Sequence, residues 1–303
     1  RRDTLEDPGR RLLAKVEPPN VLRFNHIKDR DDSPYPMYLM SVPSFLRLER
    51  PLPHQELKDQ GLLVMRSAVI SGDVLFISHQ WLGWKEPDPN MEQFNVLQQV
   101  LSNLLAGTAG DVEADWLSQL PLGDKAKVTA LEFASALPHA YIWMDYMSMP
   151  KWYTQDATTA SPDLQKALLS LPYYIEQANI IVALAPPCKH HDAKDAEGAP
   201  QVCDYRTWRS RGWCRMEYIS ALLATQQVPL MVVQGAQYTP EFMFPSDALL
   251  LLAAEGEMMA EGDKAHIKAV LDTLFDQKIA HLYATRRGLD ARWFTALRPW
   301  LLR

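Results

Sequence analysis

The residues best suited to chemistry lie in RSRGWCRMEYISALL, the stretch from 209 to 223. The spacing of its apolar residues predicts a helix after Gly212, and Trp213 and Glu217, four residues apart, would share one face of it. A carboxylate held beside an aromatic ring can orient a ribose or stabilise developing positive charge. Four arginines crowd the start of the same helix: Arg206, Arg209, Arg211 and Arg215. The structural alternative is therefore an exposed helix end at which Glu217 forms ion pairs with these arginines.

Polar side chains also follow two predicted strands. Ser78 and His79 come at the end of one apolar run and are followed by Trp81, and Asp145 ends a second run. Open parallel sheets bind ligands at the carboxyl ends of their strands, so these four residues are candidate substrate-binding residues. The structural alternatives are a hydrogen-bonded histidine in the core and an aspartate that caps the following turn.

Alternating strands and helices must position these residues. Nearly all-apolar runs predict buried strands at residues 74–78, 141–145, 179–185 and 228–234. Helical spacing predicts helices at residues 91–105, 126–137, 163–178 and 263–281 and from 286 onward, and loops are expected at 106–124 and 188–204. The predicted fold is α/β, a doubly wound parallel sheet of four to five strands with helices on both faces.

Three regions differ in composition. Residues 1–70 form a proline-rich N-terminal arm, since eight of the 22 prolines precede residue 56. We expect residues 18–50 to be ordered, largely non-helical and packed on the body through four aromatic residues, with a short helix near 54–66. These aromatic residues are Phe24, Tyr35, Tyr38 and Phe45. Residues 71–240 form the α/β domain and residues 241–303 a helical extension.

Composition excludes several functions. The formal net charge of −6 argues against broad nucleic-acid binding, which needs a cationic face. The longest purely apolar run, residues 248–254, is too short to cross a bilayer. Three cysteines cannot all pair, which favours a reducing compartment; we expect a soluble, intracellular and most simply cytoplasmic protein, with an organelle as the alternative.

The sequence lacks the motifs of several common sites. Neither a G-x-S-x-G nucleophile elbow nor a Walker loop occurs. Cys188, His190, His191 and Cys203 lack the compact spacing of a zinc site, so no metal and no resident cofactor are expected.

Four blocks in order carry a family resemblance. FISHQWLGW, YIWMDYMSMP, YIEQANIIVAL and WRSRGWCRMEY resemble the TIR domain and its fungal relative, the HET (heterokaryon incompatibility) domain. The likeness covers residues 73 to about 235, and it implies a TIR-like, flavodoxin-like topology for the sheet. It departs from the TIR pattern in showing four clear strands rather than five and in having His79-Gln80-Trp81 after the first strand.

The resemblance implies a specific chemistry. Many TIR domains are NAD glycohydrolases, and their catalytic glutamate matches Glu217. It would hold the ribose hydroxyls and balance positive charge as nicotinamide leaves. Trp213 would stack on a base, and Arg211 and Arg215 would bind the pyrophosphate at the helix start.

Two functions follow as expectations. The first is a TIR-like domain that binds NAD or a related nucleotide and cleaves its glycosidic bond. The alternative is a catalytically inactive interaction module, self-associating or an accessory subunit of a larger assembly. An enzyme needs Glu217 in an open site shared with strand-end residues, whereas a scaffold would pair it with arginines or bury it under the arm.

The C-terminal segment, residues 286–303, carries five arginines and one aspartate among its aromatic and aliphatic residues. Such a segment can attach peripherally to an anionic membrane or fill a partner's groove. The alternative is that its apolar face packs on the chain's own body.

Overall fold

The centre of the fold is a parallel sheet, as the sequence predicts. The computed structural model describes residues 33–68, 71–114, 127–150, 161–243, 248, 251–258, 260 and 262–302. The four apolar runs form β3 (Val74–His79), β6 (Tyr141–Met144), β7 (Ile180–Leu184) and β10 (Leu230–Val233). They lie in the order β6-β3-β7-β10, and every neighbouring pair among them is parallel. The prediction of one parallel sheet from these runs is confirmed.

The complete sheet is larger than predicted and mixed. Within the described residues it has nine strands, not four to five, in the order β2-β1-β6-β3-β7-β10-β11-β4-β5. The added strands are β1 (Tyr38–Ser41), β2 (Val64–Met65), β4 (Val112–Ala114), β5 (Lys127–Val128) and β11 (Glu241–Met243). Each is two to four residues long, which is too short to give a periodic signal in sequence. β1 pairs antiparallel with β6, and β11 pairs antiparallel with β10.

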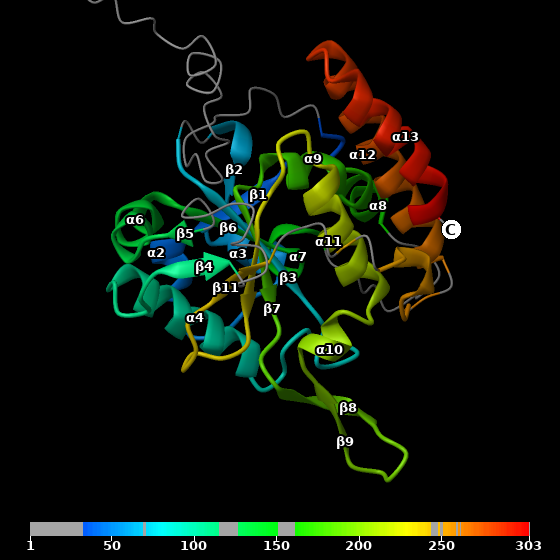
Figure 1. The fold of residues 1–303 in the computed structure, drawn as a ribbon. Helices are drawn as coiled ribbons and strands as arrows, with labels where there is room; N and C mark the ends of the chain where they lie inside the picture. Colours follow the sequence, from blue (N-terminus) through cyan, green and yellow to red (C-terminus); the bar gives the residue numbers. More distant parts are fainter. Residues whose placement is uncertain are drawn as a thin grey trace, which may run out of the picture.

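Helices cover both faces of the sheet (Figure 1). One face packs on α2 (Val42–Phe45), α3 (His54–Asp59), α4 (Glu92–Leu105) and α6 (Ala130–Ala136). The other packs on α8 (Pro162–Leu169), α9 (Leu171–Gln177), α11 (Gly212–Leu223), α12 (Asp263–Ala284) and α13 (Gly288–Leu301). Successive strand residues point to opposite faces, so Phe76 lies in one core and Leu75 and Ile77 in the other.

The described part of the N-terminal arm belongs to this body. Tyr35 and Phe45 are buried and Tyr38 is partly buried, as expected, whereas Phe24 lies outside the described residues. The predicted short helix near 54–66 is α3, which ends at Asp59 because the chain then enters β2 and the 3-10 turn η1 (Arg66–Ala68).

Some elements differ from those predicted. The predicted helix at 163–178 is two helices, α8 and α9, because Ser170 and Pro172 interrupt it. The loop predicted at 188–204 is wrong: it is a hairpin of β8 (Cys188–Lys194) and β9 (Pro200–Cys203), which projects from the body in Figure 1. Its strands have few apolar residues, so their composition indicated a loop. Three further short helical segments are η3 (Leu137–His139), α7 (Asp145–Ser148) and η5 (Ala253–Glu255), and α10 (Tyr205–Trp208) precedes α11.

The two C-terminal helices form the outermost layer on their side (Figure 1). α12 and α13 fulfil the predictions of helices at 263–281 and from 286. None of the helices among the described residues is long and apolar enough to span a bilayer.

Candidate functional site

The end of β3 presents two polar side chains to opposite helical layers. Ser78 follows Phe76 on the face that packs on α11, and His79 follows Ile77 on the face that packs on α4. β3 lies between β6 and β7 in the sheet. The chain leaves β3 toward α4 on one face and leaves β7 toward α11 on the other, so the carboxyl ends of these two strands form the kind of switch point at which open α/β sheets bind ligands.

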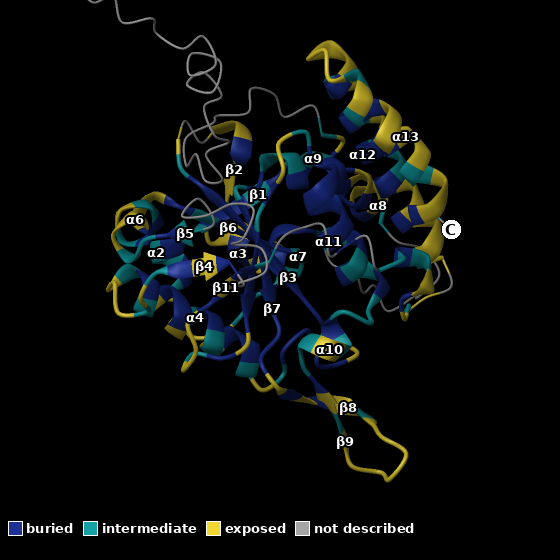
Figure 2. Ribbon diagram, in the orientation of Figure 1, coloured by how far each residue is buried: buried dark blue, intermediate teal, exposed yellow. Residues whose placement is uncertain are grey.

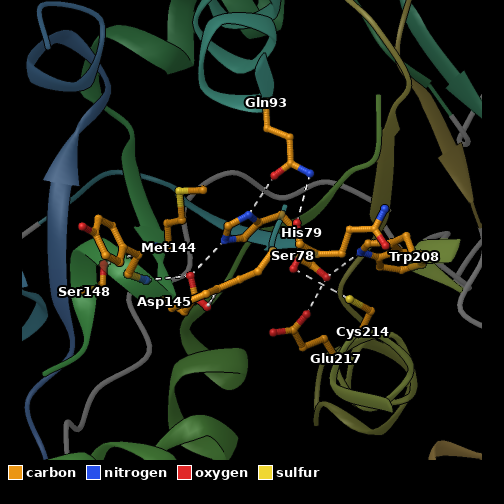
Figure 3. A network of polar contacts seen from close by, with 12 residues as sticks. Ser78, His79, Gln93, Met144, Asp145, Ser148, Trp208, Cys214 and Glu217 are labelled. Atoms are coloured by element: carbon orange, nitrogen blue, oxygen red, sulfur yellow. Dashed lines mark hydrogen bonds and ion pairs between the residues drawn. The ribbon is translucent and has the colours of Figure 1, made fainter. Parts of the chain in front are cut away.

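Ser78 is hydrogen-bonded to Glu217, as Figure 3 shows. Its Oγ–H donates to Glu217 Oε2 over 2.5 Å, and the buried Trp208 Nε1–H donates to Ser78 Oγ over 3.0 Å. α11 begins at the carboxyl edge of the sheet, so Glu217 in its second turn faces the end of β3. Ser78 is fully buried, while Glu217 is half-buried. The two predicted site residues are therefore in contact across 139 positions of sequence.

His79, which is buried, and Asp145, which is partly buried, form an ion pair on the other side of the strand end. His79 Nε2–H donates to Asp145 Oδ1 over 2.9 Å, and Nδ1–H donates to Gln93 Oε1 over 3.0 Å. The Gln93 amide N–H donates to the Gln80 carbonyl over 3.1 Å, which fixes the orientation of the amide. Both ring nitrogens of His79 are therefore engaged.

This pairing sets the charges of both groups. Burial alone would lower the pKa of His79, but the Asp145 carboxylate and the hydrogen bonds of the ring raise it above its usual value. Burial alone would raise the pKa of Asp145, yet His79 and two further donors lower it. Those donors are the Trp81 indole N–H at 2.9 Å and the Tyr146 backbone N–H at 2.6 Å. The pairing therefore favours the anion at Asp145 and the cation at His79.

The pKa of Glu217, unlike that of Asp145, is raised. Burial raises its pKa to about 8, and the negative charge of Asp145 adds to that rise, while the Ser78 hydrogen bond and His79 oppose it. At neutral pH Glu217 is mostly a neutral carboxylic acid. The site thus holds two carboxyl groups whose surroundings drive their pKa values apart.

The predicted binding residues on α11 have other contacts. Arg215 donates to the carbonyls of Arg209 and Leu252 at 2.7 and 2.9 Å, and the Arg211 guanidinium lies 3.8 Å from the Glu257 carboxylate. Within the part of the chain that the structure describes, no arginine forms an ion pair with Glu217. The Trp213 side chain is partly buried and packs against the core on its side of the sheet.

Glycine is required where α11 begins. Gly212 N–H donates to the Glu257 carbonyl over 2.9 Å, so the first amide of the helix is already occupied. A Cβ at Gly212 would overlap the Met258 side chain, and a Cβ at Gly256 would overlap the Gly212 backbone. The close approach of these two glycines holds the start of α11 in place.

The structure adds two residues that the sequence analysis missed, Gln93 and Trp208. Gln93 occupies a position on the apolar stripe of α4, four residues before Leu97, and a polar residue at such a position was the available signal. Trp208 had no signal beyond its aromatic character, because its indole N–H meets Ser78 from 130 positions away.

The three cysteines are free and buried. Cys214 is buried and its Sγ–H donates to the His79 carbonyl over 3.8 Å. Burial raises the pKa of its thiol well above the usual value, which disfavours the reactive thiolate. Cys188 and Cys203 are paired in register on the hairpin, and both are buried and free. Among the described residues, no three His, Cys, Asp or Glu side chains are grouped to hold a metal ion.

Comparison with known proteins adds no relative. No protein-family model, no curated protein and no solved structure matches this chain. The function must therefore be argued from the fold and the site alone.

Proposed function

We propose that this chain is a TIR-like hydrolase that binds NAD or a related nucleotide and cleaves its N-glycosidic bond, with Glu217 as the catalytic carboxylate. The observation that carries the proposal is the contact between Glu217 and Ser78. It brings a half-buried acidic side chain, without an arginine partner among the described residues, to the strand ends where open α/β sheets bind ligands.

The strand order supports the TIR-like part of the proposal. Numbered along the chain, the four parallel strands lie in the order second, first, third, fourth, which is the order of flavodoxin-like folds. In that topology the crevice opens between the first and third strands, here β3 and β7. Ser78 and His79 are the last two residues of β3, so they lie at this end of the sheet.

The two carboxyl groups support cleavage of a glycosidic bond. Such cleavage passes through an oxocarbenium-like transition state and commonly uses one ionised and one protonated carboxyl group. Asp145 supplies a negative charge, because its interaction with His79 offsets the unfavourable effect of burial on the carboxylate. Glu217, with a pKa of about 8, can donate a hydrogen bond to a ribose hydroxyl before reaction.

A cationic substrate fits this arrangement. The pyridinium ring of NAD carries a positive charge, which would lower the pKa of a neighbouring carboxyl group. Binding of NAD would then ionise Glu217, so that the carboxylate forms where positive charge develops on the ribose. NADH has nearly the same shape and no ring charge, so it would bind without ionising Glu217.

The test compares these two substrates. Purified chain would be incubated with NAD or NADH, and released nicotinamide and ADP-ribose would be separated by chromatography. We expect products from NAD and none from NADH. Absence of products from NAD at high protein concentration would reject catalysis on this substrate.

A second candidate is a catalytically inactive interaction module. It is favoured by the closure of the His79–Asp145 network, in which both ring nitrogens and both carboxylate oxygens already have protein partners. Such a network also serves to hold a strand end rigid. NAD binding without turnover, or no binding at all, would favour this candidate.

A further inference from the structure

One face of α13 carries apolar side chains that no described element covers. Leu289, Trp293 and Trp300 are 78%, 48% and 38% exposed. They lie four and seven residues apart and therefore form one stripe along the helix. The opposite face, with Ala291, Phe294 and Leu301, is buried in the core with α12. Figure 2 shows the outward face of α13 exposed over its length at the edge of the molecule.

Positive charge surrounds this stripe. Residues 283–302 contain four arginines and one aspartate, in a chain whose formal net charge is −6. Asp290 is bound by Arg287 over 2.7 Å. Arg298 pairs with Asp272 and Asp276 of α12 at 2.7 and 2.6 Å, so its single positive charge offsets part of the negative charge of α12. Arg292 of α13 and Arg286, two residues before the helix begins, are exposed, and neither forms an ion pair among the described residues.

We propose that the outward face of α13 docks on an anionic lipid bilayer, with the helix lying in the plane of the surface. Tryptophan is suited to the boundary between headgroups and acyl chains because its ring is apolar and its N–H remains hydrated. The exposed arginines complement anionic headgroups. α13 lies at the edge of the molecule, outside α12 (Figure 1), so no other helix stands between it and an extended surface.

This docking leaves the candidate site accessible. In Figure 1 the β8–β9 hairpin and α10 mark the carboxyl edge of the sheet, while α13 lies on the far side of α11 and α12. The proposal is independent of the proposed catalytic function. Lipid binding can therefore be tested without any measurement of catalysis.

The test uses vesicle sedimentation with the full chain. Vesicles of phosphatidylcholine alone are compared with vesicles containing phosphatidylserine as well, at low and high salt. We expect binding to the anionic vesicles, its loss at high salt, and a shift of tryptophan fluorescence to shorter wavelength. Binding that is equal for both lipids, or absent for both, would overturn the proposal.

Variants separate this face from the rest of the surface. Removing two cations with Arg286→Gln and Arg292→Gln should weaken binding about 25-fold, since each cation near an anionic surface contributes about fivefold. Leu289→Ser tests the apolar stripe at its most exposed position, where the fold does not depend on the side chain. Tyr238→Ala, at an exposed aromatic on another part of the chain, is the control and should bind as the wild type does.

The same variants identify a competing occupant. If α13 instead meets a second copy of the chain, sedimentation velocity would show a dimer that Leu289→Ser dissociates, and vesicle binding would not respond to Arg286→Gln and Arg292→Gln. That result would overturn docking on lipid.

Discussion

The raised pKa of Glu217 makes a quantitative prediction about stability. A carboxyl group whose pKa is 4.5 when unfolded and about 8 when folded keeps its proton in the folded state over that range. The unfolded chain binds fewer protons there, so the free energy of unfolding falls as pH rises, by at most about 1.4 kcal/mol per pH unit. The contribution is complete below the unfolded pKa and is lost as pH rises through the folded pKa.

Glu217→Gln removes this titration and keeps the size of the side chain and an acceptor for Ser78. Between pH 5.5 and 7.5 the wild type should lose about 1–2 kcal/mol more stability than the variant, after allowance for the partial solvent access of the carboxyl group. The raised pKa of His79 also makes stability fall as pH rises, but it acts in both proteins and largely cancels in the difference.

Urea denaturation at several pH values measures this difference directly. Glu241→Gln, which removes an exposed carboxylate on β11, is the matched control and should show no pH-dependent difference from the wild type. If wild type and Glu217→Gln lose stability in parallel between pH 5.5 and 7.5, Glu217 is not a buried acid and the assignment of charges in the site is wrong.

Three further predictions concern the elements that build the site. Ser78→Ala should cost about 1–3 kcal/mol of unfolding free energy in denaturant titrations, because the buried Trp208 N–H loses its acceptor; no change would mean the bond is not formed. Asp145→Asn should cost about 3–5 kcal/mol, because it leaves His79 buried without its counter-ion, and it should lower the pKa of His79 in an NMR titration. An unaltered His79 titration would contradict the ion pair. Gly256→Ala should lower the unfolding free energy by about 1–3 kcal/mol, because the new Cβ meets the backbone where α11 begins; a thermal midpoint equal to that of the wild type would refute this close packing.

The parallel core could be predicted from sequence because each central strand is a buried apolar run separated from the next by a helix. The outer strands could not, since β2 and β5 have two residues each and exist through pairing with distant segments. Paired strands of this length are specified by their neighbours rather than by their own side chains.

The site, like the sheet, has parts that could be predicted from sequence and parts that could not. Strand ends and a helix start were recognisable as places for chemistry, so Ser78, Asp145 and Glu217 were candidates before the structure. Which of these residues touch one another depends on how segments more than a hundred positions apart in sequence pack together. The Ser78–Glu217 hydrogen bond is such a contact. Four arginines lie near Glu217 in sequence, yet two of them, Arg215 and Arg211, bind backbone carbonyls and Glu257 instead.

The most direct test of the central claim is nicotinamide release from NAD by the wild type and by Glu217→Gln, measured under identical conditions with Glu241→Gln as control. The account predicts that the wild type and the control release nicotinamide at the same rate. Loss of one preorganised electrostatic contact should slow Glu217→Gln about a hundredfold to a thousandfold. Release at the wild-type rate by Glu217→Gln would contradict the role of this residue, and no release by the wild type would contradict the activity itself.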